Sequence, residues 1–328
     1  MTSEDLQLDV LVMGEVNPDI VVTGVPALSF GQKEDLTGPT TMTIGSSVAI
    51  TACALTRLGS RTGLVGVVGD DEFGRFILGR LRDRDVDVNR VRTKVGGRTG
   101  SSVILVRDRD SSDRQILTDP GVMGDLRADD LDLQDTNGAG HLHVGSWFLH
   151  VAAVSDLPEL LAQARHRGLT TSVDPNDDPN RTWQSHLPRA LGHLDVFFCN
   201  ESEARGVAGS LGWPPRDDAT AAARWILARL APGGTVVLKC GADGAYAFTG
   251  DQSTHVAAPR VPVVDTVGAG DSLAAGFLHA RRGGADVPAA LRLAVAVGSL
   301  STTRSGGVDG QPTWAQANAL ASALTITG

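Results

Sequence analysis

Short apolar runs alternate with amphipathic segments along most of the chain, which predicts an α/β fold. Before residue 120, the runs that favour strands cover 9–14, 19–23, 40–44, 62–68, 102–106 and 114–118. Helical periodicity appears over 46–58 and 72–84. After residue 140, strands expected near 141–145, 169–174, 194–199 and 235–239 alternate with helices expected near 155–167, 183–191, 201–208 and 217–230. This alternation implies a central, mainly parallel sheet with helices on both faces.

Two strand-rich stretches, 15–44 and 93–120, interrupt the alternation. They predict either one small β-sheet that stands off the main body or a pair of surface hairpins. In the first case, the chain consists of an α/β core and a small β domain built from these two stretches. The core is then made of residues 1–14, 45–92 and 121–328.

Composition excludes several classes of protein. With 41% hydrophobic and 20% charged residues, the 328-residue chain can form a sizeable core. The formal charge of −9 disfavours a nucleic-acid binder, because neutralising a phosphate backbone needs a basic surface. The three scattered cysteines form no metal-binding pattern. No apolar stretch is long enough to span a membrane, and the acidic N-terminus lacks a signal-peptide pattern, so we expect a cytoplasmic protein without membrane contact.

The chain contains 39 glycines, and glycine-rich loops are common in nucleotide-binding sites. The common phosphate-binding motifs are nevertheless absent. A Walker A loop needs a Gly-Lys pair, and the chain has none. The residues after the first expected strand, at 14–18, do not match the dinucleotide fingerprint GxGxxG. The HRD and DFG signatures of protein kinases are missing as well. Neither a P-loop nor a Rossmann-type dinucleotide site is therefore expected.

The segment Asp-Thr-Val-Gly-Ala-Gly-Asp at 265–271 is the remaining candidate. A helix should begin near Ala269 to Asp271, so free backbone N–H groups and the positive helix end lie at the Gly-Ala-Gly turn. Glycines at 268 and 270 let an anion approach that backbone closely. Asp271 could then act as a general base for an alcohol, or it could simply cap the helix.

The sequence resembles the ribokinase-like (PfkB) carbohydrate kinases in four motifs, which occur in the same order as in that family. The segment 265–271 resembles the C-terminal signature, and the stretches 45–59 and 65–74 resemble the N-terminal one. Asn-Glu-Ser-Glu at 200–203 matches the family's NxxE motif, and 239–244 matches the strand and turn beside the nucleotide. The resemblance covers essentially the whole chain and implies a ribokinase-like fold with a small β-sheet lid.

The resemblance implies ATP-dependent phosphorylation of an alcohol, usually a sugar hydroxymethyl group, with Mg²⁺ as the metal. Carried over by position, Asp271 would be the general base, and the backbone of Gly268, Ala269 and Gly270 would be the anion hole. The residues that the resemblance places on the nucleotide side are Lys239, Gly241, Gly244, Asn200, Asp174 and Asn176. Asn200 and Glu203 would orient Mg²⁺ through water, and Asp265 resembles a position where many members bind K⁺ or another monovalent cation.

For the acceptor, the resemblance points to Asp19 and Asn17 in the first substrate loop and to Gly45 and Ser46 in the substrate turn. The chain departs from the family here, because Ser46 replaces the second glycine of the turn and Ile50 replaces an asparagine. An apolar Ile50 removes one hydroxyl contact, so a ribokinase-type specificity does not follow. The family's lid often forms a dimer, so a homodimer through the lid is expected.

Three functions are therefore compatible with the sequence. The leading hypothesis is an ATP-dependent kinase for a small sugar or sugar derivative. An adenosine-type nucleoside kinase uses the same chemistry, because ribose offers the same hydroxymethyl group. A non-catalytic sugar- or nucleotide-binding regulator is the alternative of another class. The intact Gly-Ala-Gly-Asp turn at 268–271 favours an enzyme over this regulator.

Overall fold

The computed structural model describes residues 7–27, 31, 34–107 and 114–328. Within these residues, ten strands form one large sheet. In spatial order they are β14 (Ile326–Thr327), β13 (Gln252–Val256), β12 (Ala245–Thr249), β11 (Thr235–Lys239), β10 (Val196–Asn200), β9 (Thr170–Asp174), β8 (His141–Gly145), β1 (Val10–Met13), β4 (Thr62–Gly69) and β5 (Asp87–Lys94).

The strands from β11 through β5 all run parallel, and β12, β13 and β14 add an antiparallel edge. The central strands are buried on both faces, as expected of a parallel sheet covered by helices. In β10, Phe198 faces one hydrophobic core while its neighbour Phe197 faces the other. Because successive side chains of a strand point to opposite faces, the sheet separates two cores.

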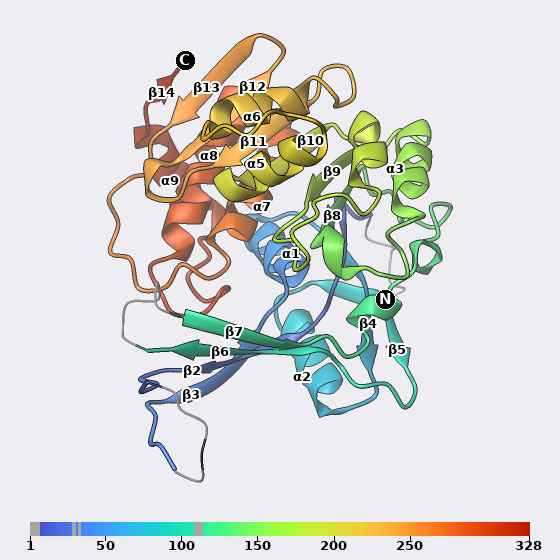
Figure 1. Ribbon diagram of the computed structural model, residues 1–328, viewed down its shortest axis with the longest axis vertical. Helices are drawn as coiled ribbons and strands as arrows, with labels where there is room; N and C mark the ends of the chain where they lie inside the picture. Colours follow the sequence, from blue (N-terminus) through green and yellow to red (C-terminus); the bar gives the residue numbers. More distant parts are fainter. Residues whose placement is uncertain (1–6, 28–30, 32–33, 108–113) are drawn as a thin grey trace, which may run out of the picture.

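Helices cover both faces of the large sheet (Figure 1). One face carries α1 (Ser47–Leu58), α2 (Glu72–Arg82), α7 (Ala269–Arg282), α8 (Val287–Ser301) and α9 (Trp314–Ala323). The other face carries α3 (Leu157–His166), α4 (Leu187–Ala190), α5 (Glu201–Ser210) and α6 (Ala219–Leu227). Short 3-10 turns occur at Met123–Asp125, Ala128–Asp130, Trp147–Leu149, Leu191–His193 and Gly241–Asp243. The mainly parallel α/β fold expected from the sequence is confirmed.

The strand-rich stretches form one small sheet, which decides against separate hairpins. Its strands lie in the order β3 (Thr40–Ile44), β2 (Pro18–Val22), β6 (Ser101–Val106) and β7 (Arg114–Asp119). The small sheet lies beside the main body, below α1 and α7 in the view of Figure 1. Because β2 and β3 lie between β1 and α1 in the chain, the loops that follow β1 and precede α1 both lead into the small sheet.

Several elements differ from the sequence prediction. The helix expected over 183–191 is shorter in the structure, where only α4 forms. Trp183, Ser185 and His186 adopt positive φ angles, which a helix does not allow. The edge strands β5, β12, β13 and β14, and the helices α8 and α9, were not predicted. Strand β5 belongs to the large sheet and includes Thr93 and Lys94, which the prediction assigned to the small β domain.

The two helices that border the candidate site begin and end as the sequence indicates. In α1, the Ser46 hydroxyl accepts from the backbone N–H of Ala49, and Gly59 ends the helix in the left-handed conformation. Helix α7 starts at Ala269 after Gly268, which has a φ of 69°. Helices α7 and α8 pack closely, because a Cβ on Gly276 would lie 3.0 Å from the Ala294 Cα. Among the described residues, no helix combines the length and apolarity required to cross a bilayer.

The close packing of α7 on α8 generates a stability prediction. Gly276→Val should lower the free energy of unfolding by about 1–3 kcal/mol, because the added atoms overpack two buried helices. Gly79→Val is the matched control, since a Cβ on this helical glycine of α2 meets no atom within 4 Å. It should change stability by no more than about 0.5 kcal/mol. Urea unfolding monitored by circular dichroism compares the two variants, and equal losses would contradict the packing argument.

Candidate active site

The candidate residues converge because the parallel strands end at one edge of the large sheet. Asp174 is the last residue of β9, Asn200 of β10 and Lys239 of β11, and Glu15 and Ser146 follow β1 and β8 within two residues. Ligands of open α/β sheets bind outside the carboxyl ends of the strands. The N-termini of α1 and α7 lie at the same edge, where Ser47 of α1 contacts Asp271 of α7.

Asp271 lies in the first turn of α7, directly after the Gly268-Ala269-Gly270 turn. A Cβ on Gly268 would lie 2.8 Å from Ile50 Cγ2 and 3.0 Å from the Gly307 carbonyl oxygen. Together with the positive φ, this crowding makes glycine the fitting residue at position 268. The start of α7 leaves backbone N–H groups without an intrahelical partner, so the turn can receive an anion. The Ala269 N–H already donates to the Thr266 carbonyl at 3.3 Å.

Burial and neighbouring charge hold the Asp271 carboxyl in an unusual state. Burial and, second to it, the negative charge of Asp174 raise its pKa from 3.8 to about 6. Hydrogen bonds from Ser47 and Asn176, together with the positive charge of Lys239, act in the opposite direction. A carboxylate with a pKa close to neutrality is suited to accept a proton at physiological pH.

The acceptor-side candidates surround the start of α1. The Asn17 amide donates to Asp19 Oδ1 at 3.2 Å, and burial raises the pKa of Asp19 to about 7. A Cβ on Gly45 would lie 2.1 Å from Asp19 Oδ1, so only glycine allows this approach. Ser46 has a φ of 70°, which explains why glycine is the usual residue of this turn in the family, and its hydroxyl donates to the Glu15 carbonyl at 2.5 Å.

The nucleotide-side candidates cluster around a buried ion pair. Lys239 Nζ lies 2.6 Å from Asp174 Oδ2, and the Asp174 side chain is 1% exposed. Although burial acts to lower the pKa of Lys239, the charges of Asp174 and Glu203 outweigh it and raise the pKa. A Cβ on Gly270 would lie 3.4 Å from Lys239 Nζ, so the ammonium group adjoins the glycine turn before Asp271.

Asn200 and Glu203 form a capping box at the start of α5. Glu203 Oε2 accepts from the Asn200 backbone N–H at 2.7 Å, and Asn200 Oδ1 accepts from the Glu203 N–H at 2.9 Å. Burial raises the pKa of Glu203 to about 7, while the charge of Lys239 lowers it. Among the described residues, no group of three His, Cys, Asp or Glu side chains is placed to hold a metal ion. Contact between this pair and a metal through water fits that arrangement better than direct ligation.

Beside Lys239 lies a cavity of about 790 Å³, which Gly241, Gly244 and Gly270 also line. Its remaining wall is largely apolar and includes Val263, Leu273 and Val295. A cavity with an apolar wall and one buried cation at its edge has the character of a ligand site. The structure thus brings Lys239, Gly241 and Gly244 to one cavity.

Asp265 has a local role in this structure. Its two carboxylate oxygens accept from the backbone N–H groups of Val267 and Gly306 at 3.0 and 2.9 Å. These bonds join the segment before α7 to the loop after α8. The monovalent cation expected near Asp265 stays a prediction.

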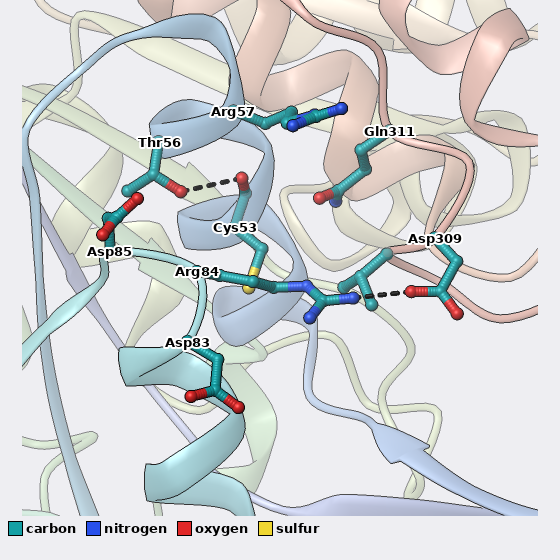
Figure 2. A pocket seen from close by; sticks show the side chains of 9 residues that line it. Cys53, Thr56, Arg57, Asp83, Arg84, Asp85, Asp309 and Gln311 are labelled. Carbon is teal, nitrogen blue, oxygen red and sulfur yellow. Dashed lines mark hydrogen bonds and ion pairs between the residues drawn. The ribbon is translucent and has the colours of Figure 1, made fainter.

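Another cavity lies away from these residues, near the C-terminal end of α1 (Figure 2). It has a volume of about 400 Å³ and contains the Arg84–Asp309 ion pair. Figure 2 shows Cys53 of α1 beside the stem of Arg84, and burial raises the pKa of its thiol to about 12. Its lining contains acidic as well as basic side chains, so it presents no single charge to a ligand.

The sequence analysis missed one carboxylate of the site, Glu15. Its Oε1 accepts from the Ser47 backbone N–H at 2.9 Å and from the Ser146 hydroxyl at 2.8 Å, and burial raises its pKa to about 7. Ser47 in turn donates to Asp271 Oδ1 at 2.5 Å. The available signal was a charged residue directly after a buried strand, Gly14-Glu15, at the edge where the other candidates lie.

The chain is similar to known proteins over nearly its whole length. Residues 8–314 match the family model described as pfkB family carbohydrate kinase. One relative is 5-dehydro-2-deoxygluconokinase 2 of Bacillus cereus, with 27% identity over 96% of this chain and 95% of that protein. The ribokinase of Arabidopsis thaliana, solved with ribose and ATP, has a TM-score of 0.80 at 23% identity and covers 96% of this chain and 99% of that one.

A second structural neighbour is an E. coli protein assigned as ribokinase II and solved with ATP and Mg²⁺. It has a TM-score of 0.80 at 24% identity, covering 95% of this chain and 98% of that chain. These likenesses show that the chain has a ribokinase-like fold.

The raised pKa of Asp271 predicts an effect of pH on stability. Because its folded-state pKa lies above the ordinary value, Asp271 contributes stability below about pH 4 that is lost as the pH rises through about 6. Asp271→Asn should therefore raise the Tm at pH 8 by several degrees, and the difference should disappear toward pH 4. The free-energy change is at most about 3 kcal/mol, since one pKa unit corresponds to about 1.4 kcal/mol.

Differential scanning calorimetry at pH 4 and pH 8 tests this expectation. Asp178→Asn serves as the control, because Asp178 accepts several hydrogen bonds near Trp183 that lower its pKa. This variant should lower the Tm at pH 8, where Asp271→Asn raises it. A Tm for Asp271→Asn that lies below the wild-type value at pH 8 would refute the assignment of a costly buried charge.

Proposed function

The chain belongs to the pfkB family of carbohydrate kinases, which are ATP-dependent phosphotransferases, and we propose that it phosphorylates a hydroxymethyl group of a small sugar or sugar derivative. The observation that carries the proposal is the environment of Asp271. Its carboxylate lies at the start of α7, beside the Gly268-Ala269-Gly270 turn, and already accepts a hydrogen bond from a hydroxyl group, that of Ser47.

In the proposed reaction, Asp271 removes the proton from the acceptor hydroxyl while the hydroxyl oxygen attacks the γ-phosphorus of ATP. The bond between the γ-phosphorus and the β,γ-bridging oxygen breaks, and ADP leaves. The backbone N–H groups of 268–270 and the positive end of α7 stabilise the charge on the transferred phosphoryl group. Positioning and charge neutralisation account for most of the rate enhancement in phosphoryl transfer. A base with a pKa of about 6 is largely ionised at neutral pH and ready for this proton.

ATP fits the cavity beside Lys239. The apolar wall suits a nucleobase, and Lys239 adjoins the glycine turn, where it can contact phosphate oxygens. Asp174, held by Lys239, and Asn176 complete this side of the site. Mg²⁺ supplies the charge neutralisation that triphosphate binding requires, and Asn200 and Glu203 would hold it through water. We keep a monovalent cation near Asp265 as part of the proposal.

The acceptor is proposed to bind between α1 and the small sheet, which would act as its lid, over residues 15–44 and 93–120. Asp19, Asn17, Gly45 and Ser46 line the α1 side. By strand alternation, Ser102, Thr118 and Arg114 share the face of the small sheet on which Asp19 lies. These side chains suit hydroxyl groups, and Arg114 also suits a carboxylate, so sugar acids belong among the acceptors tested.

An assay of ADP release across acceptors tests the proposed function. Sugars, sugar acids and nucleosides are supplied with ATP and Mg²⁺, and we expect ADP release that depends on a sugar or sugar acid. Asp271→Asn should abolish phosphorylation, because the base is lost, while the affinity for ATP measured by calorimetry changes little. Turnover near the wild-type rate in this variant would refute Asp271 as the base. If only nucleosides serve as acceptors, the protein is a nucleoside kinase. If no acceptor stimulates ADP release, it is a binding protein.

We also propose that the protein forms a homodimer through the small sheet. The face opposite Asp19 carries mainly apolar side chains, and Thr40 and Gln115 are its polar members beside Val22 and Leu105. The apolar side chains are Ile20, Val22, Met42, Val103, Leu105 and Leu117. Met42 is 43% exposed and Leu117 is 50% exposed. A contiguous apolar surface of this kind is typical of an interface between protein chains. A second copy of the same sheet is the proposed occupant.

Adjacent residues of β7 provide a matched test of the dimer. Leu117→Glu places a charge on the apolar outer face, whereas Ile116→Glu places it on the face toward the acceptor site. Both wild-type side chains are 50% exposed. Light scattering at micromolar concentration should find a dimer for the wild type and Ile116→Glu, and a monomer for Leu117→Glu. A monomeric wild type, or a dimer that survives Leu117→Glu, would contradict this interface.

A further inference from the structure

Glu15 is a buried carboxylate that links the ends of two strands to the start of a helix. It follows β1 within two residues and is 5% exposed. Oε1 accepts from the Ser47 backbone N–H of α1 and from the Ser146 hydroxyl, which follows β8. Its backbone carbonyl accepts from the Ser46 hydroxyl at 2.5 Å. Within the described chain, the buried Oε2 has no hydrogen-bond partner, so the side chain is held through Oε1 alone.

The first connection from Glu15 to Asp271 runs through Ser47. The backbone N–H of Ser47 is fixed by Glu15 Oε1 at 2.9 Å, and its hydroxyl donates to Asp271 Oδ1 at 2.5 Å. Because one residue makes both bonds, the position of Ser47 sets where the Asp271 carboxylate is held. The left-handed φ of 70° at Ser46 brings the chain into this arrangement.

The second connection runs through Ser146 and Asn176. Ser146 donates its hydroxyl to Glu15 at 2.8 Å and its backbone N–H to Asn176 Oδ1 at 3.0 Å. The Asn176 side chain also lowers the pKa of Asp271, which places its amide next to that carboxyl group. Ser146 has a φ of 49° and Asn176 a φ of 54°, both in the left-handed region that ordinary residues rarely adopt. Backbone strain of this kind persists where the surrounding contacts enforce it, as Glu15 does here.

We propose that Glu15 is a positioning residue for phosphoryl transfer, which acts through Ser47 and through Ser146 with Asn176 to fix the orientation of the Asp271 carboxylate. This inference rests on the proposed function of Asp271 as the base. Two connections lead from Glu15 Oε1 toward this carboxylate, one through Ser47 of α1 and one through the residues that follow β8 and β9. Glu15 itself has no proposed contact with ATP or with the acceptor.

Variants of Glu15 separate positioning from a merely structural role. Glu15→Ala removes the acceptor atom of both connections and should lower kcat by about 10- to 100-fold, since a misplacement of about 1 Å can cost about 100-fold in rate. The KM for ATP should stay within about twofold, because Lys239 and its cavity are untouched. Glu15→Gln keeps an acceptor oxygen and should retain kcat within about threefold of the wild type. Equal losses in the two variants would overturn the proposal.

A double-mutant cycle with Ser47→Ala tests whether Glu15 acts through Ser47. The effects of two substitutions in the same connection do not add. The double variant should therefore lose about as much kcat as Glu15→Ala alone. Losses that multiply would show that Glu15 works independently of Ser47 and would overturn this connection. Asp195→Asn, which weakens the Arg165–Asp195 ion pair before the start of β10, is the control for general destabilisation, and its kcat per folded molecule should match the wild type.

A crystal structure of ligand-free Glu15→Ala provides a readout that does not depend on turnover. We expect the Ser47–Asp271 hydrogen bond to be lost, and an unchanged Asp271 carboxylate would overturn the proposal. The wild-type ADP-release assay serves as the separate check on the proposed function. If the wild type releases no ADP with any acceptor, the kinase assignment fails, while the crystal structure still decides whether Glu15 positions Asp271.

Discussion

The ion pair between Asp174 and Lys239 joins the ends of β9 and β11 within a site that is otherwise acidic. Glu15, Asp19, Glu203 and Asp271 are all in or next to this site, and burial raises the pKa of each. Lys239 offsets the charges of Glu203 and Asp271, and Arg114 offsets that of Asp19. The pKa of Lys239 rises despite burial because Asp174 and Glu203 lie beside it. An ATP molecule would add further negative charge, which the proposed Mg²⁺ and the positive end of α7 would offset. The overall acidity of the chain is therefore compatible with a triphosphate ligand.

The rest of the fold stabilises an arrangement that is locally unfavourable. Ser46, Ser146 and Asn176 have left-handed backbone angles, and the nearby carboxylates repel one another when ionised. Two extended cores, one on each side of the large sheet, supply the packing that offsets these costs. Close packing of neighbouring groups also limits which residues can stand in the site. The Gly45 position, for example, accepts no Cβ because Asp19 occupies that space.

The sequence predicted the fold well where local signals agree with the tertiary structure. Helix α1 has a capping serine at one end and Gly59 at the other, and α7 has a glycine turn before it, so both were located closely. The edge strands β12, β13 and β14 lack a long apolar run and depend on pairing with distant residues, so local patterns did not indicate them. Glu15 was missed for a similar reason. Its partners Ser47 and Ser146 lie 32 and 131 residues away, and only the folded chain brings them together.

Strands β2 and β3 are inserted between β1 and α1, so the small sheet and the large sheet are separate parts of the fold. Asp19 lies on β2 and Gly45 directly follows β3, whereas Lys239, Asp174 and Asp271 belong to the large sheet and α7. If the acceptor and a second copy of the chain bind at the small sheet, as proposed, mutation of its strands changes acceptor choice and self-association without changing the large sheet. A chain of this topology can then take new substrates through changes in two short segments, and the costly arrangement of buried charges stays intact.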